Sequence, residues 1–152
     1  MIAPDKALAA LAELLETPVP TPEKSGAHIF PLSEDMRLGV EFLPGGAGVV
    51  AWSEAGAAEG RDAEDKAADF LRLHLARLCG APGIEAALDA ERLLLFWRGR
   101  PETAREWIDA VAALLNEAEA SRRVSATSAG GGHSQPAAES LFAGMAGWIG
   151  TR

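Results

Sequence analysis

The stretch of residues 62–80, DAEDKAADFLRLHLARLCG, constrains the fold more than any other part of the chain. Its apolar residues follow the helical period, Asp62 can cap the first free N–H groups, and Gly80 followed by Pro82 ends the helix. The apolar face spans about 180°, whereas a helix that lies on one sheet needs only about 100°. This stretch therefore predicts a helix with a second surface to cover besides a sheet.

Before this helix the chain predicts one short helix and three strands. Residues 5–16 predict a Leu-rich helix, which a proline-rich connector follows. Short apolar or alternating segments predict strands at 28–30, 36–42 and 48–52. Pro31 places the first strand at a sheet edge or strand end, and Pro-Gly-Gly between the other two predicts a hairpin turn. Residues 53–61 predict a loop of small residues.

After the central helix the chain predicts two more strands and a last helix. Residues 84–88 form the first of these strands. The unbroken run LLLFW between Arg92 and Arg98 predicts a strand that is covered on both faces. The last helix is predicted to begin at Pro101, and its apolar face of about 120° is wide enough only for packing on the sheet.

The chain changes character after Ser121. The sequence predicts a folded domain over residues 1–121, a flexible Gly/Ser-rich linker over 122–140 and an apolar C-terminal segment over 141–152. The large apolar residues of that segment share one helical face, although its glycines cost a helix about 1 kcal/mol each. The segment is either a disordered end or a tethered segment that occupies a groove of the domain. The apolar residues of this face are Leu141, Phe142, Met145, Trp148 and Ile149.

Charge and composition exclude several classes of partner. The chain has 152 residues, with 22 acidic against 14 basic ones and a net charge of −8. This charge disfavours nucleic acid, whose binding rests on phosphate neutralisation, and also anionic membrane surfaces. No apolar run is long enough to cross a bilayer, and acids interrupt the N-terminal region where a secretory signal would be apolar. Because Cys79 is the only cysteine, no internal disulfide can form, and we expect a cytoplasmic protein.

The sequence contains no recognisable catalytic or metal site. Its three histidines, His28, His74 and His133, lack the spacing of metal ligands. His74 lies within the apolar arc of the central helix, which favours a core or interface histidine over a catalytic base. Cys79 is expected to be an inert thiol, and the glycines around Gly46 lack the Lys-Ser/Thr of a phosphate-binding loop. We therefore expect no enzyme, no metal and no cofactor, and the surplus apolar surface favours protein binding.

The order of elements resembles the class I type III secretion chaperones, the Tir-chaperone-like family. The resemblance covers residues 5–120. It is carried by the helix LAALAELL, the segment HIFPL, the hairpin RLGVEFLPGGAGVVAW, a central helix ending LARLCG, the strand pair IEAALDAERLLLFW and the helix WIDAVAALLNEAE. It implies an α+β fold of order α-β-β-β-α-β-β-α, with a twisted, mainly antiparallel sheet packed with helices.

The resemblance also implies a function and its residues. The protein would be a homodimeric export chaperone that holds the N-terminal segment of a secreted effector in extended form. A dimeric adaptor or regulator of the same fold, unconnected to secretion, remains the alternative. The implied effector-binding residues are Leu8, Leu11, Leu15, Ile29, Phe30, Leu38, Val40 and Phe42. The implied dimer interface on the central helix consists of Ala68, Leu71, Leu75 and Leu78.

Overall fold

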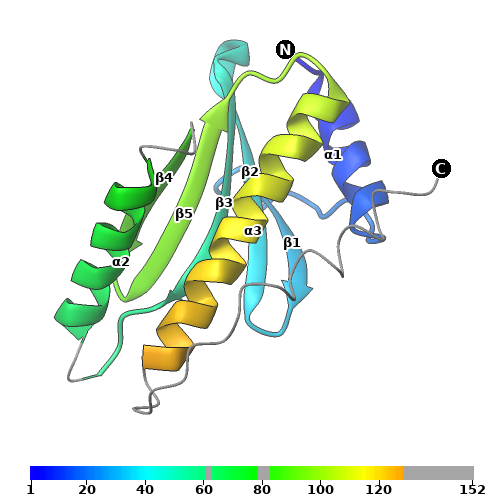
Figure 1. Cartoon of the computed structure of the whole chain (residues 1–152). Helices are drawn as coiled ribbons and strands as arrows, with labels where there is room; N and C mark the ends of the chain where they lie inside the picture. Colours follow the sequence, from blue (N-terminus) through cyan, green and yellow to red (C-terminus); the bar gives the residue numbers. More distant parts are fainter. Residues whose placement is uncertain (61–62, 79–82, 129–152) are drawn as a thin grey trace, which may run out of the picture.

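A five-stranded antiparallel sheet and three helices make up the described part of the chain (Figure 1). The computed structural model describes residues 1–60, 63–78 and 83–128. The strand order is β1-β2-β3-β5-β4, and the predicted element order α-β-β-β-α-β-β-α is confirmed. The strands are β1 (His28–Ser33), β2 (Met36–Leu43), β3 (Gly48–Ala57), β4 (Ile84–Asp89) and β5 (Arg92–Gly99). The helices are α1 (Pro4–Leu14), α2 (Ala63–Leu78) and α3 (Ala104–Ser128).

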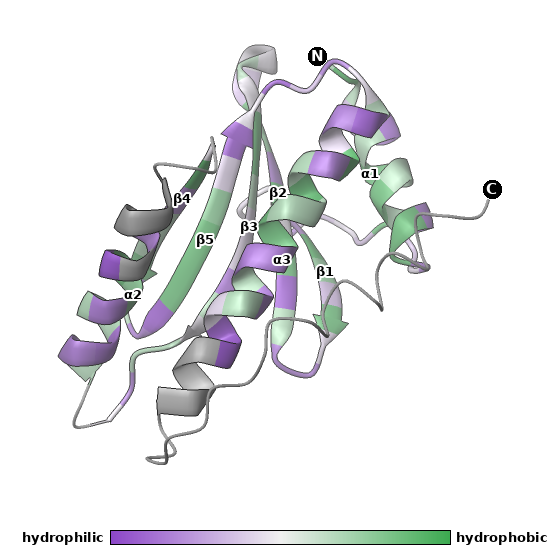
Figure 2. Cartoon of the chain, viewed as in Figure 1, coloured by the Kyte–Doolittle hydropathy of each residue, from purple (hydrophilic) through white to green (hydrophobic). Residues whose placement is uncertain are grey.

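The described helices pack on one face of the sheet. Burial alternates along β3, where Val49, Ala51 and Ser53 are fully buried while Val50 and Trp52 between them are half-buried. Side chains of a strand point alternately to the two faces, so the buried set marks the helix-covered face. Figure 1 shows α3 lying across the middle of the sheet, α1 next to it and α2 beside β4. Figure 2 shows the hydrophobic colour along β3 and β5 and hydrophilic patches on the visible turns of α2 and α3.

The N-terminal region is fastened to α3. The indole Nε1 of Trp107 donates a hydrogen bond to the carbonyl oxygen of Ala7 at 3.1 Å, and the Trp107 and Trp97 ring centroids lie 5.9 Å apart. The backbone N–H of Ile2 donates to the Pro101 carbonyl at 2.7 Å. The Met1 ammonium lies 2.8 Å from the carboxylate of Glu102 and lowers the pKa of that carboxyl. Trp107 is therefore the central packing residue between α1, α3 and β5.

Both ends of α3 differ from the prediction. The helix begins at Ala104 instead of Pro101, because the Thr103 hydroxyl accepts a hydrogen bond from the Glu106 N–H at 3.1 Å and so caps the first turn. It continues to Ser128, so residues 122–128 are helical and do not begin the linker. Contacts with the rest of the domain extend the helix: Arg122 bonds the backbone oxygen of Asp35. The predicted segments at 129–152 lie outside the described residues.

The predicted loop at 53–61 is also wrong for residues 53–57, because β3 continues to Ala57. Ser53 is fully buried and its hydroxyl donates to the Arg37 carbonyl of β2 at 2.9 Å. On the other side β3 stays paired with β5 as far as Ala57 opposite Arg92, with a register shift between Glu54 and Gly56. Pairing with β5 thus outweighs the low strand propensity of these small residues.

The central helix α2 is confirmed over residues 63–78, whereas its predicted ends lie outside the described residues. This holds for Asp62, Cys79, Gly80 and Pro82. Of the apolar arc, Phe70 is buried in the core, and Ala67 and Leu71 are half-buried against it. The predicted hairpin turn is a 3₁₀ turn at Pro44–Gly46, in which Gly45 and Gly46 have positive φ angles of 65° and 71°. None of the described helices combines the length and the hydropathy that a bilayer-spanning segment requires.

Candidate protein-binding surface

The opposite face of the sheet carries large apolar side chains that no described helix covers. We call this surface the open face. Strand pairing places its members together: Trp52 of β3 lies opposite Phe96 of β5, and Glu54 opposite Leu94. They surround a hollow of about 500 Å³. The apolar residues of the open face, all half-buried, are Ile29, Val50, Trp52, Leu94 and Phe96.

The position of Trp52 depends on the glycine opposite it. Gly39 of β2 is the registered partner of Trp52, and a Cβ added at Gly39 would lie 2.0 Å from Cε2 of the indole ring. The ring therefore lies directly on the backbone of Gly39, an arrangement in which an aromatic residue covers a glycine across neighbouring strands. The glycine allows the large ring to lie flat on the sheet and to form part of the floor of the hollow.

We expect Gly39→Ala to destabilise the protein by about 1–3 kcal/mol, because the new methyl group must displace the Trp52 ring. The same substitution in a Trp52→Ala background should cost much less, since the clash is then absent. Chemical denaturation of the four proteins of this double-mutant cycle measures the coupling. Additive effects of the two substitutions would contradict the contact.

Charged side chains form a rim around the apolar part of the open face. Arg37 and Arg92 both pair with Glu54, the latter at 3.4 Å, and Arg92 also pairs with Asp89. The guanidinium of Arg98 lies 5.9 Å from the centroid of the Phe96 ring. Ion pairs at a protein surface typically contribute about 1 kcal/mol or less each. An apolar centre with a polar rim is the usual composition of a protein–protein interface.

The open face corrects one prediction from the sequence. The run LLLFW was expected to be covered on both faces, and the helix-covered face indeed buries Leu93 and Leu95. On the other face Leu94 and Phe96 remain half-buried, and no helix of the described residues lies over them. The apolar run was thus the sequence signal for this surface. The sequence could not show that the second cover is missing from the described chain.

A serine, a histidine and a glutamate meet between α2 and α3. His74 Nε2 lies 3.0 Å from the Ser121 hydroxyl, and Nδ1 lies 3.7 Å from a carboxylate oxygen of Glu117. The serine–histidine–glutamate arrangement matches that of a nucleophilic triad. However, the Ser121 hydroxyl donates its hydrogen bond to the backbone carbonyl of Glu117 at 2.8 Å and not to His74. Ser121 and His74 are each only 2% exposed. A substrate has no access to Ser121 here, and the contact joins the two helices.

This outcome agrees with the prediction that His74 is a core or interface histidine. The Phe70 ring packs against the His74 imidazole edge-on, with centroids 4.6 Å apart. His28 also has a local role, because its Nδ1 bonds the Pro20 carbonyl oxygen at 2.8 Å and fixes the proline-rich connector to β1. Within residues 1–60, 63–78 and 83–128, no three His, Cys, Asp or Glu side chains gather into a group that could hold a metal ion.

Comparison with known proteins finds a likeness of fold to a solved structure. No family model matches the chain, and no curated protein matches it. Among solved structures, its fold is similar to a chain in the crystal structure of the ExsC–ExsE complex. The TM-score is 0.60 at 16% sequence identity, over 79% of this chain and 91% of that chain. At this identity, the likeness to the ExsC–ExsE structure establishes the fold.

Within this ExsC–ExsE-like fold, most of the predicted effector-binding residues belong to the core. Leu8, Leu11, Phe30, Leu38 and Val40 are buried on the helix-covered side. Leu15 and Phe42 are half-buried and pack against the same core. Ile29 is the member of the predicted set that lines the open face. Contact of these residues with an effector stays a prediction, and in this conformation the five buried ones offer almost no surface for it.

The structure describes the side chains of only two of the four residues in the predicted dimer interface. Ala68 and Leu71 are half-buried on α2, and Leu71 also packs against the core. The side chains of Leu75 and Leu78 lie outside the described residues. The helix has a core contact through Phe70 and a contact with α3 through His74, which together account for part of its wide apolar arc. Dimerisation through the remaining part stays a prediction.

Proposed function

We propose that the protein is a cytoplasmic export chaperone, related to the class I type III secretion chaperones. It binds the N-terminal segment of a secreted effector in extended form and keeps that segment competent for secretion. It acts as a homodimer by binding alone, without a catalytic group, metal or cofactor. The resemblance of the sequence to this family supports the proposal, and so does a fold similar to that of a chain crystallised in a complex of two proteins.

The open face is the single observation that carries the proposal. Large apolar patches on a protein surface usually mark sites of interaction with other proteins. Here Trp52, Leu94 and Phe96 form such a patch beside ion pairs that can rearrange around a bound chain. Aromatic residues dominate the binding energy of protein interfaces, because they bury much area with few rotatable bonds. A segment in extended form can place alternate side chains into this hollow.

The sheet edges offer a second means of holding an extended segment. β1 and β4 are the outer strands, and each has only one neighbouring strand within the described chain. An added strand would gain main-chain hydrogen bonds that do not depend on its sequence. Pro31 removes one donor from β1, whereas β4, IEAALD, contains no proline. Main-chain pairing would supply general affinity, and the open face would select the apolar side chains of the effector.

The homodimer is part of the same proposal. Its interface would lie on α2, with Ala68, Leu71, Leu75 and Leu78 meeting their counterparts across a two-fold axis. An isologous interface places the same surface on both subunits, so one apolar helix face is sufficient. Light scattering on the purified full chain should give twice the mass of one 15.9 kDa chain. A monomeric mass across the micromolar range would refute this part of the proposal.

Co-purification from the native host tests the function. We expect the tagged full chain to retain a secreted protein, and limited proteolysis of the complex to spare only that protein's N-terminal segment. The corresponding synthetic peptide should then bind the purified chain and displace the full-length partner. If the chain instead retains a partner through a folded domain, and the partner's N-terminus is not protected, the result would support the alternative function, a dimeric adaptor unconnected to secretion.

A further inference from the structure

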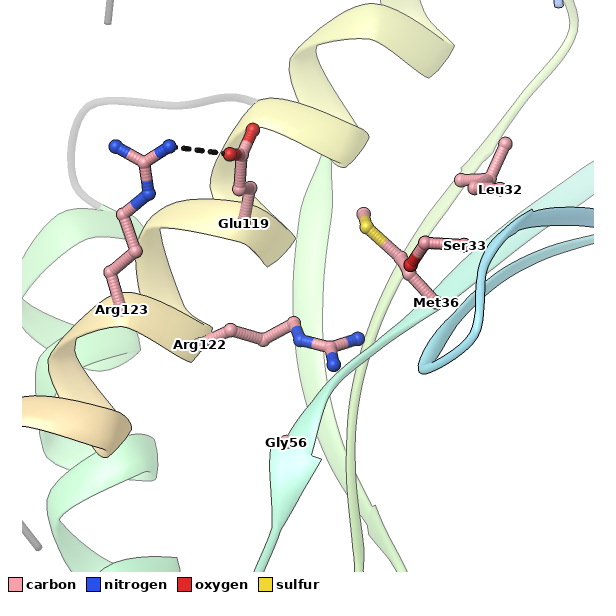
Figure 3. Close-up of a pocket in the computed structure, with 7 residues that line it drawn as sticks. All are labelled: Leu32, Ser33, Met36, Gly56, Glu119, Arg122 and Arg123. Carbon is pink, nitrogen blue, oxygen red and sulfur yellow. Dashed lines mark hydrogen bonds and ion pairs between the residues drawn. The ribbon is translucent and has the colours of Figure 1, made fainter. Parts of the chain in front are cut away.

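A second hollow, of about 640 Å³, lies at the end of α3 on the helix-covered side of the sheet (Figure 3). We call it the α3-end pocket. Leu32 and Met36 contribute its apolar wall from the β1–β2 hairpin, and Glu119 and Arg122 line it from α3. Figure 3 shows Met36 projecting from the hairpin toward α3, with the Arg122 side chain between helix and sheet. The volume lies within the range of about 300–1,000 Å³ that is usual for ligand-binding pockets.

From β3, only a glycine lines this pocket. Gly56 lines it and has no side chain to fill the space under α3, and its neighbours along β3 are Ala55 and Ala57. Leu32 and Met36 are therefore only half-buried, although both pack against the core cluster. The local sequence leaves an apolar depression under the last described turns of the helix.

The charged groups around the pocket already have partners of opposite charge. Arg122 bonds the Asp35 backbone oxygen and lies 3.9 Å from the Asp35 carboxylate, which fastens the hairpin to α3. Arg123 pairs with Glu119 at 2.6 Å, as the dashed line in Figure 3 marks. Because each arginine faces a carboxylate, the pocket does not present a free cationic centre to an anion. Its chemistry suits apolar side chains that enter between paired charges.

The chain itself carries such side chains in the sequence that follows α3. α3 ends at Ser128, about 9 Å along the helix axis from Arg122. Residues 129–140 are rich in Gly, Ser and Ala, and a flexible chain of that length spans about 19 Å. Residues 141–149 then place Leu141, Met145 and Trp148 at helical spacing on one apolar face. Since Gly144 and Gly147 weaken an isolated helix, this face needs a partner surface to be stable.

We propose that residues 141–149 dock into the α3-end pocket of the same chain, with their apolar side chains against Leu32 and Met36. The tether gives the segment an effective concentration in the millimolar range, so weak contacts are enough to hold it there. Docking covers the half-buried hairpin side chains and leaves the open face on the other side of the sheet accessible. The inference does not depend on an effector, and it stands or falls separately from the proposed function.

Site-specific photo-crosslinking of the full chain tests the inference. Trp148 is replaced by p-benzoylphenylalanine, the protein is irradiated at low micromolar concentration, and mass spectrometry identifies the linked residues. We expect links to residues 32–36 or 119–123 of the same chain. A mixture of isotopically heavy and light chains should yield almost no mixed species. Links mainly to the open face, links between chains, or no links at all would each overturn the proposal.

A matched pair of substitutions connects the crosslink to the pocket. Met36→Glu should reduce crosslinking at least tenfold, because a carboxylate replaces part of the apolar wall in a pocket that Glu119 also lines. Val19→Glu, on a side chain that is 45% exposed in the proline-rich connector, should leave the yield unchanged. Far-UV circular dichroism verifies that both variants are folded. An equal yield in all three proteins would show that the segment does not dock beside Met36.

Discussion

Trp107→Ala is expected to lower the free energy of unfolding by about 3–5 kcal/mol, a large fraction of the stability of a domain of this size. Trp107 has no exposed surface and is the largest fully buried side chain among the described residues. Its indole packs against Trp97 of β5 and donates a hydrogen bond to Ala7 of α1. Removing the ring would leave a cavity between two helices and the sheet and deprive the Ala7 carbonyl of this donor.

Urea denaturation followed by circular dichroism measures the effect. Trp107→Phe keeps most of the ring volume but loses the N–H group, so it should cost less, about 1–3 kcal/mol. Trp52→Ala provides a comparison on the open face, where the ring is half-buried, and it should cost less than Trp107→Ala. If Trp107→Ala unfolds at the same urea concentration as the parent protein, the assigned packing between α1, α3 and β5 is wrong.

The order of elements could be predicted because it depends on local periodicity. Alternation along residues 36–42 and the turn at Pro44 define a hairpin by themselves, and the structure pairs Leu38 with Ser53 and Phe42 with Val49 accordingly. The predicted boundaries of elements are wrong where contacts between residues far apart in the sequence decide them. β3 continues to Ala57 because β5 still pairs with it beyond Ser53, its last partner position to β2, and α3 continues beyond Ser121, where Arg122 bonds the backbone oxygen of Asp35.

The candidate surface was harder to predict than the fold, because burial of an apolar strand residue depends on which face of the sheet the helices pack against. Leu11 and Phe30 have the composition expected of a binding groove, yet both are completely buried. Phe96 and Leu94 belong to an apolar run that resembles a buried strand, yet the described helices cover only the opposite face. Strand alternation separates the two faces of β5, but only the packed structure shows which one is free.

The surplus of apolar residues predicted on the central helix is partly used within the domain. In α2 part of it is used by the core through Phe70 and by the buried contact of His74 with α3. The open face around Trp52 is a different apolar surface, which the sequence did not single out. The contacts of α2 stabilise the domain, whereas the open face leaves apolar area exposed and therefore indicates a partner. Substitutions on the open face should consequently affect binding more than folding.

Trp52→Ala is expected to weaken binding of the partner's N-terminal segment about 30-fold or more, the loss typical of an aromatic residue at the centre of an interface. The probe is the synthetic peptide identified by co-purification, and isothermal titration calorimetry measures its affinity for the full chain. Val19→Ala is the matched control, because it also removes an exposed apolar side chain but lies outside the lining of the open face.

The comparison with Gly39→Ala strengthens this test, because that variant keeps the Trp52 side chain but displaces its ring. If the peptide contacts the Trp52 ring where it lies over Gly39, Gly39→Ala should also weaken binding, although the indole is still present. If the peptide binds elsewhere, neither variant should change its affinity beyond the change seen with Val19→Ala. That second result would remove the open face as the binding surface even if co-purification identified a partner.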